Sequence, residues 1–405
     1  MEISARIDPP AWMGATETVA LVRALTADGA TVRFVGGCVR DAVLGREAKD
    51  IDLATPDPPE TVMALLKRAG LRAVPTGLGH GTITAVVEKA HYEVTTLRRD
   101  VSTDGRRAVV AFTDDWVADA SRRDFTLNAL YADADGAVSD PTGGIGDLRT
   151  GTVRFVGDPA QRIGEDTLRV LRYFRFHAWY GKPPVDEASY AACRAAAGDL
   201  GNLSAERVAG EALRLLAAPE PLEAVRLMAE AGVLKAVAPE ARDLDSFARL
   251  LELEESIDPL LRLGVLIADG DGPGRAAALA ARLRFSNADS ARLKLMMEAA
   301  LTVAGGVNER AARTLIYAFG NAAFEDGVQV ARARAGVGEK FEPLIDLSRS
   351  WPAPTLPVRG ADARALGIDK GPRVGEALRA LETWWVENDF APTREACLEK
   401  LRGLV

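Results

Sequence analysis

The strongest constraint on the fold is a change of pattern near residue 155. Before it, short β-branched or alternating segments predict strands, at residues 31–35, 51–54, 82–87 and 92–97. After it, the chain is rich in Ala, Leu and Arg at helical spacing almost to its end. Strands in the first third and helices in the rest predict an α+β unit followed by an all-helical part.

Length and composition narrow the class of protein. With 405 residues and 48% hydrophobic content, the chain is expected to form two to four units. No apolar run approaches the roughly 20 residues of a membrane span, and the N-terminus lacks a basic segment before an apolar one. We therefore expect a soluble, cytoplasmic protein with no membrane partner, and no protein partner is implied.

Scattered cysteines and histidines exclude other kinds of site. The three residues of each type form no close pairs, which argues against a disulfide framework, a zinc site or a histidine-based catalytic triad. A net charge of −8 argues against a protein that coats nucleic acid nonspecifically. The arginines are clustered, however, and a local cluster can still bind RNA.

A glycine pair followed by an Asp-x-Asp predicts a phosphate and metal site. Gly36 and Gly37 end a β-branched run and precede a short helical segment that stops at Gly45. Backbone N–H groups at a helix start, approached through residues without a Cβ, can bind phosphate. Asp50 and Asp52 lie two apart in a predicted strand, so both carboxylates point to one face. Two carboxylates beside a site that can bind the phosphates of a nucleoside triphosphate are suitable ligands for Mg²⁺.

A second motif begins with Arg122, Arg123 and Asp124, just ahead of an apolar, helix-compatible stretch up to Tyr131. A guanidinium presents a planar fork of donors to phosphate, and a neighbouring aspartate can orient it. The motif therefore predicts a counter-charge for the triphosphate. The alternative is a capping and surface-charge role.

A third motif, at residues 164–176, combines an apolar stripe with a polar face at helical spacing. The polar residues recur every three positions: Asp166, Arg169, Arg172 and Arg175. Asp166 accepts hydrogen bonds and Arg169 donates them, which matches the amino group and ring nitrogen that cytosine and adenine share. Such a pair rejects uracil and guanine, which invert that pattern. The alternative is a surface salt bridge along a helix.

In this order the motifs resemble those of the class II tRNA nucleotidyltransferases, the CCA-adding enzymes, whose family also contains bacterial poly(A) polymerases. The resemblance lies in residues 36–41 with Asp50 and Asp52, and in residues 122–131, 140–148, 165–175 and 203–211. Residues 367–375 resemble the family's C-terminal segment less specifically.

The resemblance implies a polymerase-β-type nucleotidyltransferase head at residues 1–155. It further implies a base-recognising helical neck (156–230), a helical body (231–346) and a helical tail (347–405) that contacts tRNA. The implied activity is the Mg²⁺-dependent, template-independent addition of C and A from CTP and ATP to the 3′ end of tRNA, with release of pyrophosphate.

Site residues follow from the same resemblance. Asp50 and Asp52 are the implied catalytic and metal-binding residues, and Glu93 is a candidate third carboxylate. The implied nucleotide-binding residues are Gly37, Arg40, Arg123, Asp166, Arg169, Arg172 and Arg175.

Alternative functions remain open within and outside this class of enzyme. A poly(A) polymerase or a partial enzyme that adds only CC or only A shares most motifs. Residues 99–107 resemble the flexible loop of family members that add C and then A, which favours full CCA addition. A non-catalytic RNA-binding module would not need Asp50, Asp52 and Asp166. A small-molecule nucleotidyltransferase would not need the Asp166 and Arg169 pair or the helical body.

Overall fold

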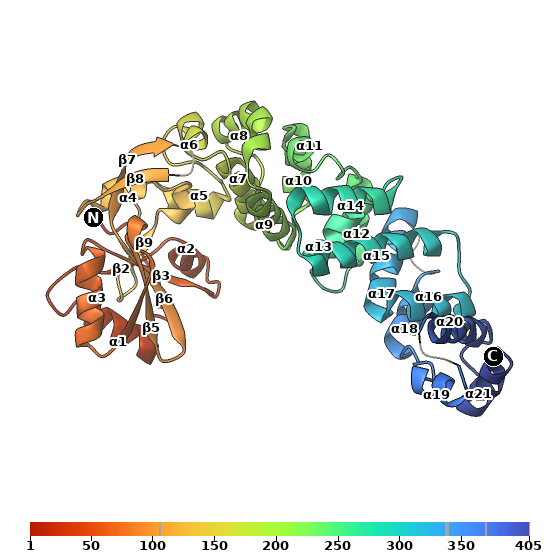
Figure 1. The fold of residues 1–405 in the computed structure, drawn as a ribbon. Helices are drawn as coiled ribbons and strands as arrows, with labels where there is room; N and C mark the ends of the chain where they lie inside the picture. The colour runs from red at the N-terminus through yellow and green to blue at the C-terminus, as the bar shows by residue number, and fades with distance from the viewer. Residues whose placement is uncertain (105–106, 337–339, 369–370, 405) are drawn as a thin grey trace. The chain divides into compact units, whose positions relative to one another are not determined.

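The computed structural model describes residues 1–104, 107–336, 340–368 and 371–404, with only the backbone described between residues 100 and 110. These residues divide into two compact units, Met1–Val237 and Ala238–Val405 (Figure 1). Among the described residues, strands occur only in the first unit, and the second unit is helical. The predicted α+β class is confirmed, while the boundaries of the four predicted domains stay predictions.

The first unit is built on a mixed sheet with the strand order β1-β10-β9-β2-β3-β6-β5-β4. Neighbouring strands are antiparallel except for β3 and β6, which are parallel. The strands are β1 (Ala5–Arg6), β2 (Arg33–Val35), β3 (Ile51–Thr55), β4 (Arg72–Gly77), β5 (Thr82–Val87), β6 (Ala90–Thr96), β9 (Tyr131–Ala132) and β10 (Ala137–Ser139). A separate hairpin consists of β7 (Arg98–Asp104) and β8 (Arg107–Phe112). Each predicted strand segment contains a strand, which confirms that part of the prediction.

Helices cover the sheet and extend the unit beyond it. Helices α1 (Thr16–Leu25) and α3 (Pro59–Arg68) pack on the β4–β6 part of the sheet, and α2 (Gly37–Val43) packs on β2 and β3. The others are η1 (Leu78–His80), α4 (Trp116–Ser121), η2 (Thr126–Asn128), α5 (Gly144–Thr150), α6 (Pro159–Glu165), α7 (Arg169–Tyr180), α8 (Glu187–Ala195), η3 (Ala196–Asn202), α9 (Ala205–Leu216), α10 (Leu222–Glu230) and α11 (Val233–Val237).

The stretch up to Tyr131, which the sequence made compatible with a helix, is not an α-helix. The apolar stretch after Asp124 forms only the 3₁₀ turn η2 and then enters the sheet as β9. Residues 125–132 are all buried. A short, continuously apolar segment gives no periodicity that separates a buried strand from a buried helix.

The described residues of the second unit form a stack of helices, and their buried apolar side chains include two separate clusters. One cluster centres on Phe324 and Val328, and the other on Leu381 and Trp385. The helices are α12 (Leu244–Leu253), α13 (Pro259–Ile267), α14 (Gly272–Leu283), α15 (Asn287–Ala304), α16 (Glu309–Phe319), α17 (Asn321–Ala335), α18 (Glu342–Ser350), α19 (Gly360–Ala365), α20 (Pro372–Glu387) and α21 (Arg394–Arg402). Within the described part of the chain, no helix combines the length and the hydrophobicity that a membrane span requires.

Candidate active site

A cavity of about 600 Å³ in the first unit collects several of the predicted site residues. Its wall comes from α2, the loop before β3, the end of α7 and the end of α9. It is lined by Gly37, Arg40, Asp41, Arg46, Glu47, Lys49, Asp50, Asp52, Arg175, Phe176, Trp179, Tyr180, Arg214 and Ala217. The fold thus brings the Asp-x-Asp motif together with Arg40 of α2 and Arg175 of α7.

The carboxylates of this cavity concentrate negative charge. Asp52 lies in β3, Asp50 directly precedes that strand, and Glu93 lies opposite Asp52 on the parallel strand β6. Burial, together with the charges of Glu93 and Asp50, raises the pKa of Asp52 to about 6. In the described residues no three His, Cys, Asp or Glu side chains form a metal site. Two repelling carboxylates fit a hard divalent cation, which takes its other ligands from phosphates and water.

Arg123 approaches the glycine pair and is held from the other side. Gly36 has φ 74° and ψ −124°, a conformation that favours glycine, and a Cβ there would lie 3.5 Å from Arg123 Nη1. Arg123 Nη2 donates to Asp119 Oδ2 at 3.0 Å, and Arg123 Nε donates to the Tyr131 hydroxyl at 3.3 Å. Asp119 also accepts from Arg122 Nη2 at 2.7 Å. Sequence reasoning missed Asp119 of α4, although it precedes Arg122 and Arg123 by three and four residues, which is a recognisable signal.

Asp119 makes stability sensitive to acid. Burial opposes its ionisation, but Arg123 and Arg122 lower the pKa of Asp119 to about 2, below its ordinary 3.8. The stabilisation that ionised Asp119 gives the folded state is present above about pH 4 and is lost as the pH falls toward 2. A pKa shift of nearly two units corresponds to about 2 kcal/mol. We expect the wild type to lose about 2 kcal/mol more than Asp119→Asn over this range in urea unfolding. Equal losses would contradict the ion-pair role, and the exposed Asp114→Asn is the matched control.

Two predicted nucleotide contacts, Arg172 and Arg40, belong to one hydrogen-bonded network. Arg172 Nε donates to Asp124 Oδ2 at 2.7 Å, and Asn128 Nδ2 donates to Asp124 Oδ1 at 3.1 Å. The Asn128 Oδ1 atom in turn accepts from Arg40 Nη1 at 2.7 Å. Asn128, which sequence reasoning did not single out, therefore connects α2 through Asp124 to α7.

Arg175 lies between an acid and an aromatic ring. Its Nε is 3.1 Å from Glu211 Oε2, and its guanidinium lies 4.3 Å from the ring centroid of Phe176. Burial lowers the pKa of Arg175 to about 10, and Glu211 opposes that shift. Glu211 is itself buried on α9, so it fixes the position of Arg175 in the cavity wall.

The predicted shared helix face of the third motif is wrong for Asp166. This residue ends α6 in an extended conformation with φ −155°, and α7 starts three residues later. Asp166 Oδ1 accepts from the backbone N–H of Leu168 at 3.2 Å, a local bond that competes with helix continuation. Asp166 Oδ2 accepts from Arg207 at 2.6 Å, whereas Arg169 pairs with Glu165.

Asp166 and Arg169 are thus held by different partners. Both are half-buried, and both lie outside the set of described residues that line the cavity. Their predicted role in base recognition stays a prediction. The apolar stripe of the same motif is confirmed, since Leu171 and Phe174 of α7 are buried.

Two other predicted segments are described in part. The loop at residues 99–107 includes 105–106, which lie outside the described residues, and the rest of it belongs to the β7–β8 hairpin. The C-terminal segment at 367–375 likewise includes 369–370, outside the described residues.

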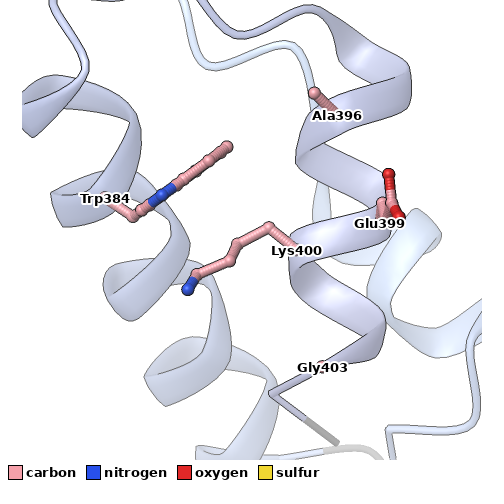
Figure 2. A pocket seen from close by; sticks show the side chains of 5 residues that line it. All are labelled: Trp384, Ala396, Glu399, Lys400 and Gly403. Atoms are coloured by element: carbon pink, nitrogen blue, oxygen red, sulfur yellow. The ribbon is translucent and has the colours of Figure 1, made fainter.

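A smaller pocket of about 350 Å³ lies between α20 and α21 in the second unit. Figure 2 shows Trp384 and Lys400 projecting from the two helices into the space between them, and Lys400 Nζ lies 5.6 Å from the Trp384 ring centroid. Ala396, Glu399 and Gly403 complete the lining. This pocket lies in the segment predicted to contact tRNA, and that contact stays a prediction.

Comparisons with known proteins match two segments of this chain to family models. A family model described as the poly A polymerase head domain matches residues 32–154, and one described as a probable RNA and SrmB binding site of polymerase A matches residues 184–244. The mitochondrial CCA tRNA nucleotidyltransferase 1 of Danio rerio is 32% identical over 91% of this chain and 86% of its own length. The Mus musculus protein of the same name is 33% identical over 92% and 86%.

A solved structure extends the likeness to the fold. The CCA-adding enzyme of Bacillus stearothermophilus in complex with CTP aligns with a TM-score of 0.76 and 27% identity over 96% of both chains. Sequence and structure therefore agree over nearly the whole chain. This protein belongs to the family of CCA-adding enzymes, the CCA tRNA nucleotidyltransferases.

Proposed function

We propose that this protein adds C and A nucleotides from CTP and ATP to the 3′ end of tRNA without a nucleic-acid template, releasing pyrophosphate. The cavity that unites Asp50 and Asp52 with Arg40 and Arg175 carries this proposal. It offers carboxylates for a metal ion and guanidiniums for phosphates within one cavity. A relative of known structure binds CTP, and most of this chain aligns with it.

The proposed chemistry is the attack of the tRNA 3′-hydroxyl on the α-phosphate of the nucleotide. Enzymes of this family generally depend on a divalent metal ion, and we propose Mg²⁺ held by Asp50 and Asp52. When bound, the metal lowers the pKa of the attacking hydroxyl and stabilises the leaving pyrophosphate. Glu93, beside Asp52, remains a candidate third carboxylate.

Arg40 and Arg123 are suited to neutralise phosphate charge because both are held in place before any nucleotide binds. Arg40 donates to both carboxylate oxygens of Asp41 at 3.0 Å and to Asn128. Arg123 is fixed by Asp119 and Tyr131. Donors with a fixed orientation need no reorganisation during the reaction, so they stabilise its transition state more than mobile ones. Gly37, at the start of α2, leaves room for the phosphates beside Arg40.

Base selection is assigned to the segment from Asp166 to Arg175. We propose that Asp166 and Arg169 read the cytosine or adenine edge by exchanging their present partners for the base. Arg172 and Arg175, fixed by Asp124 and Glu211, would form the wall against which the nucleotide is positioned.

The proposal is tested by offering each of the four nucleoside triphosphates to three RNAs. We expect CTP to be added to tRNA lacking the whole CCA end, ATP to tRNA lacking only the final A, and neither UTP nor GTP to be added. Long A tracts on generic RNA would identify a poly(A) polymerase instead, and addition of only C or only A a partial enzyme. Absence of any Mg²⁺-dependent transfer would favour the RNA-binding module.

A cytoplasmic location also remains a proposal. Three vertebrate relatives carry the word mitochondrial in their names. Fractionation of the cells that make this protein would decide the location.

A further inference from the structure

One part of the cavity wall has no role in the site described so far. It consists of Arg46 and Lys49 from the loop between α2 and β3, Trp179 from the end of α7, and Arg214 from α9. The three cationic side chains are exposed, and Arg214 retains 64% of its side-chain surface even though it pairs with Glu211. This wall combines positive charge with an aromatic ring.

Trp179 is held through one edge of its indole ring and through its backbone. Its Nε1 donates to the Arg214 carbonyl oxygen at 2.9 Å, and its own carbonyl oxygen accepts from Arg46 Nη1 at 3.3 Å. The residue is only half-buried. Its backbone and ring edge are therefore fixed while part of its surface lines the cavity.

The other two aromatic rings that line the cavity each lie against a cation. Arg40 and Arg46 lie 4.3 and 5.1 Å from the ring centroid of Tyr180, whose hydroxyl donates to Asp41 at 3.0 Å. Phe176 contacts Arg175 in the same way. In the part of the chain that the structure describes, Trp179 is the cavity aromatic with no cation against its ring.

A fixed aromatic surface flanked by exposed guanidiniums is typical of sites that bind single-stranded nucleic acid, with bases stacked and phosphates paired. We propose that Trp179, with Arg46 and Arg214, seats the 3′ end of the RNA acceptor. The terminal base stacks on Trp179 and the last phosphates contact the two arginines, so that the terminal hydroxyl reaches Asp50 and Asp52. This inference rests on the proposed function and identifies where its second substrate binds.

The incoming nucleotide is the competing occupant of this wall. Its phosphates are assigned to Arg40 and Arg123, and its base to Asp166 and Arg169, which lie outside the cavity lining. That assignment leaves the part of the wall around Trp179 free for the RNA that supplies the hydroxyl. This part of the wall lines the same cavity as Asp50 and Asp52. The two occupants predict different kinetic changes.

The test uses the full-length variants Trp179→Leu and Trp179→Phe. We expect Trp179→Leu to raise the KM for tRNA lacking CCA about tenfold, with the KM for CTP within twofold of wild type, and Trp179→Phe to restore most of the loss. The matched control is Trp12→Leu, since Trp12 packs against Phe34 away from the cavity lining. Thermal unfolding checks that each variant is folded. If Trp179→Leu does not fold, Arg46→Gln with Arg214→Gln, two exposed residues of the same wall, still tests the RNA site.

Binding without nucleotide separates this inference from the proposed function. We expect the affinity of Trp179→Leu for tRNA lacking CCA to fall about tenfold even where no transfer can occur. We expect the double variant Arg46→Gln with Arg214→Gln to make that affinity less sensitive to salt. The slope of log affinity against log salt concentration should decrease by roughly one to two units. If only the KM for CTP rises, Trp179 contacts the incoming nucleotide, and the proposed RNA-binding role of Trp179 is wrong. Unchanged tRNA affinity in all these variants would also overturn it. If the wild type transfers no nucleotide but the variants still bind tRNA more weakly, the proposed function is wrong and the proposed RNA-binding site is supported.

Discussion

Asp50→Asn and Asp52→Asn are each expected to lower nucleotide incorporation at least about 10³-fold while leaving tRNA affinity within twofold. Each substitution removes one of two negative charges that would hold the metal ion in the cavity. Metal ions supply several kcal/mol of transition-state stabilisation, and each 1.4 kcal/mol corresponds to a tenfold change in rate. Single-turnover incorporation of CTP into tRNA lacking CCA measures the loss, and filter binding measures the affinity.

These variants should remain folded, so the loss can be assigned to chemistry. Because burial, Glu93 and Asp50 raise the pKa of Asp52, its ionised form is disfavoured in the metal-free protein. Asp52→Asn removes that charge, and we expect its melting temperature without metal to be no lower than that of the wild type. Glu47→Gln, in the same cavity wall, is the matched control, with activity expected within threefold. Weak tRNA binding by Asp50→Asn would count against the metal role.

The fold was predictable where one face of an element is buried and the other is not. The strand at residues 82–87 was predicted with its observed bounds, because its burial alternates residue by residue. The segment at 125–132 was not, because it is buried throughout and thus has no period to read. The division of the described residues after Val237 also left no clear signal, since helices continue on both sides of it.

Contacts between site residues were predictable where both residues belong to one motif, and not where they belong to different motifs. The spacing of Asp50 and Asp52 fixes their proximity, because they are neighbours on one face of one segment. The hydrogen-bond partners of the arginines could not be predicted from the sequence. Arg172 binds Asp124, which is 48 residues away, and Arg40 binds Asn128, which is 88 residues away. Such pairings depend on how α7 and α2 pack, which no local pattern records.

Asp124→Leu is expected to lower the free energy of unfolding by about 3 kcal/mol and to raise the KM for CTP. Asp124 is buried and accepts hydrogen bonds from Arg172, Asn128 and the N–H of Phe125. Removing one partner of a buried ion pair leaves an uncompensated charge, which typically costs roughly 3–5 kcal/mol, and the partial exposure of Arg172 places this case at the lower end. Urea unfolding of the full chain measures the stability.

A double-mutant cycle separates this ion pair from simple loss of packing. If Asp124 acts by compensating Arg172, the double variant Asp124→Leu with Arg172→Met should lose at least about 1 kcal/mol less stability than the two single variants combined. Additive losses would show that the two side chains stabilise the unit independently. The KM for CTP should remain raised in the double variant, because Asn128 still lacks the acceptor that orients it toward Arg40. A normal KM in either variant would contradict the link from Asp124 through Asn128 to Arg40.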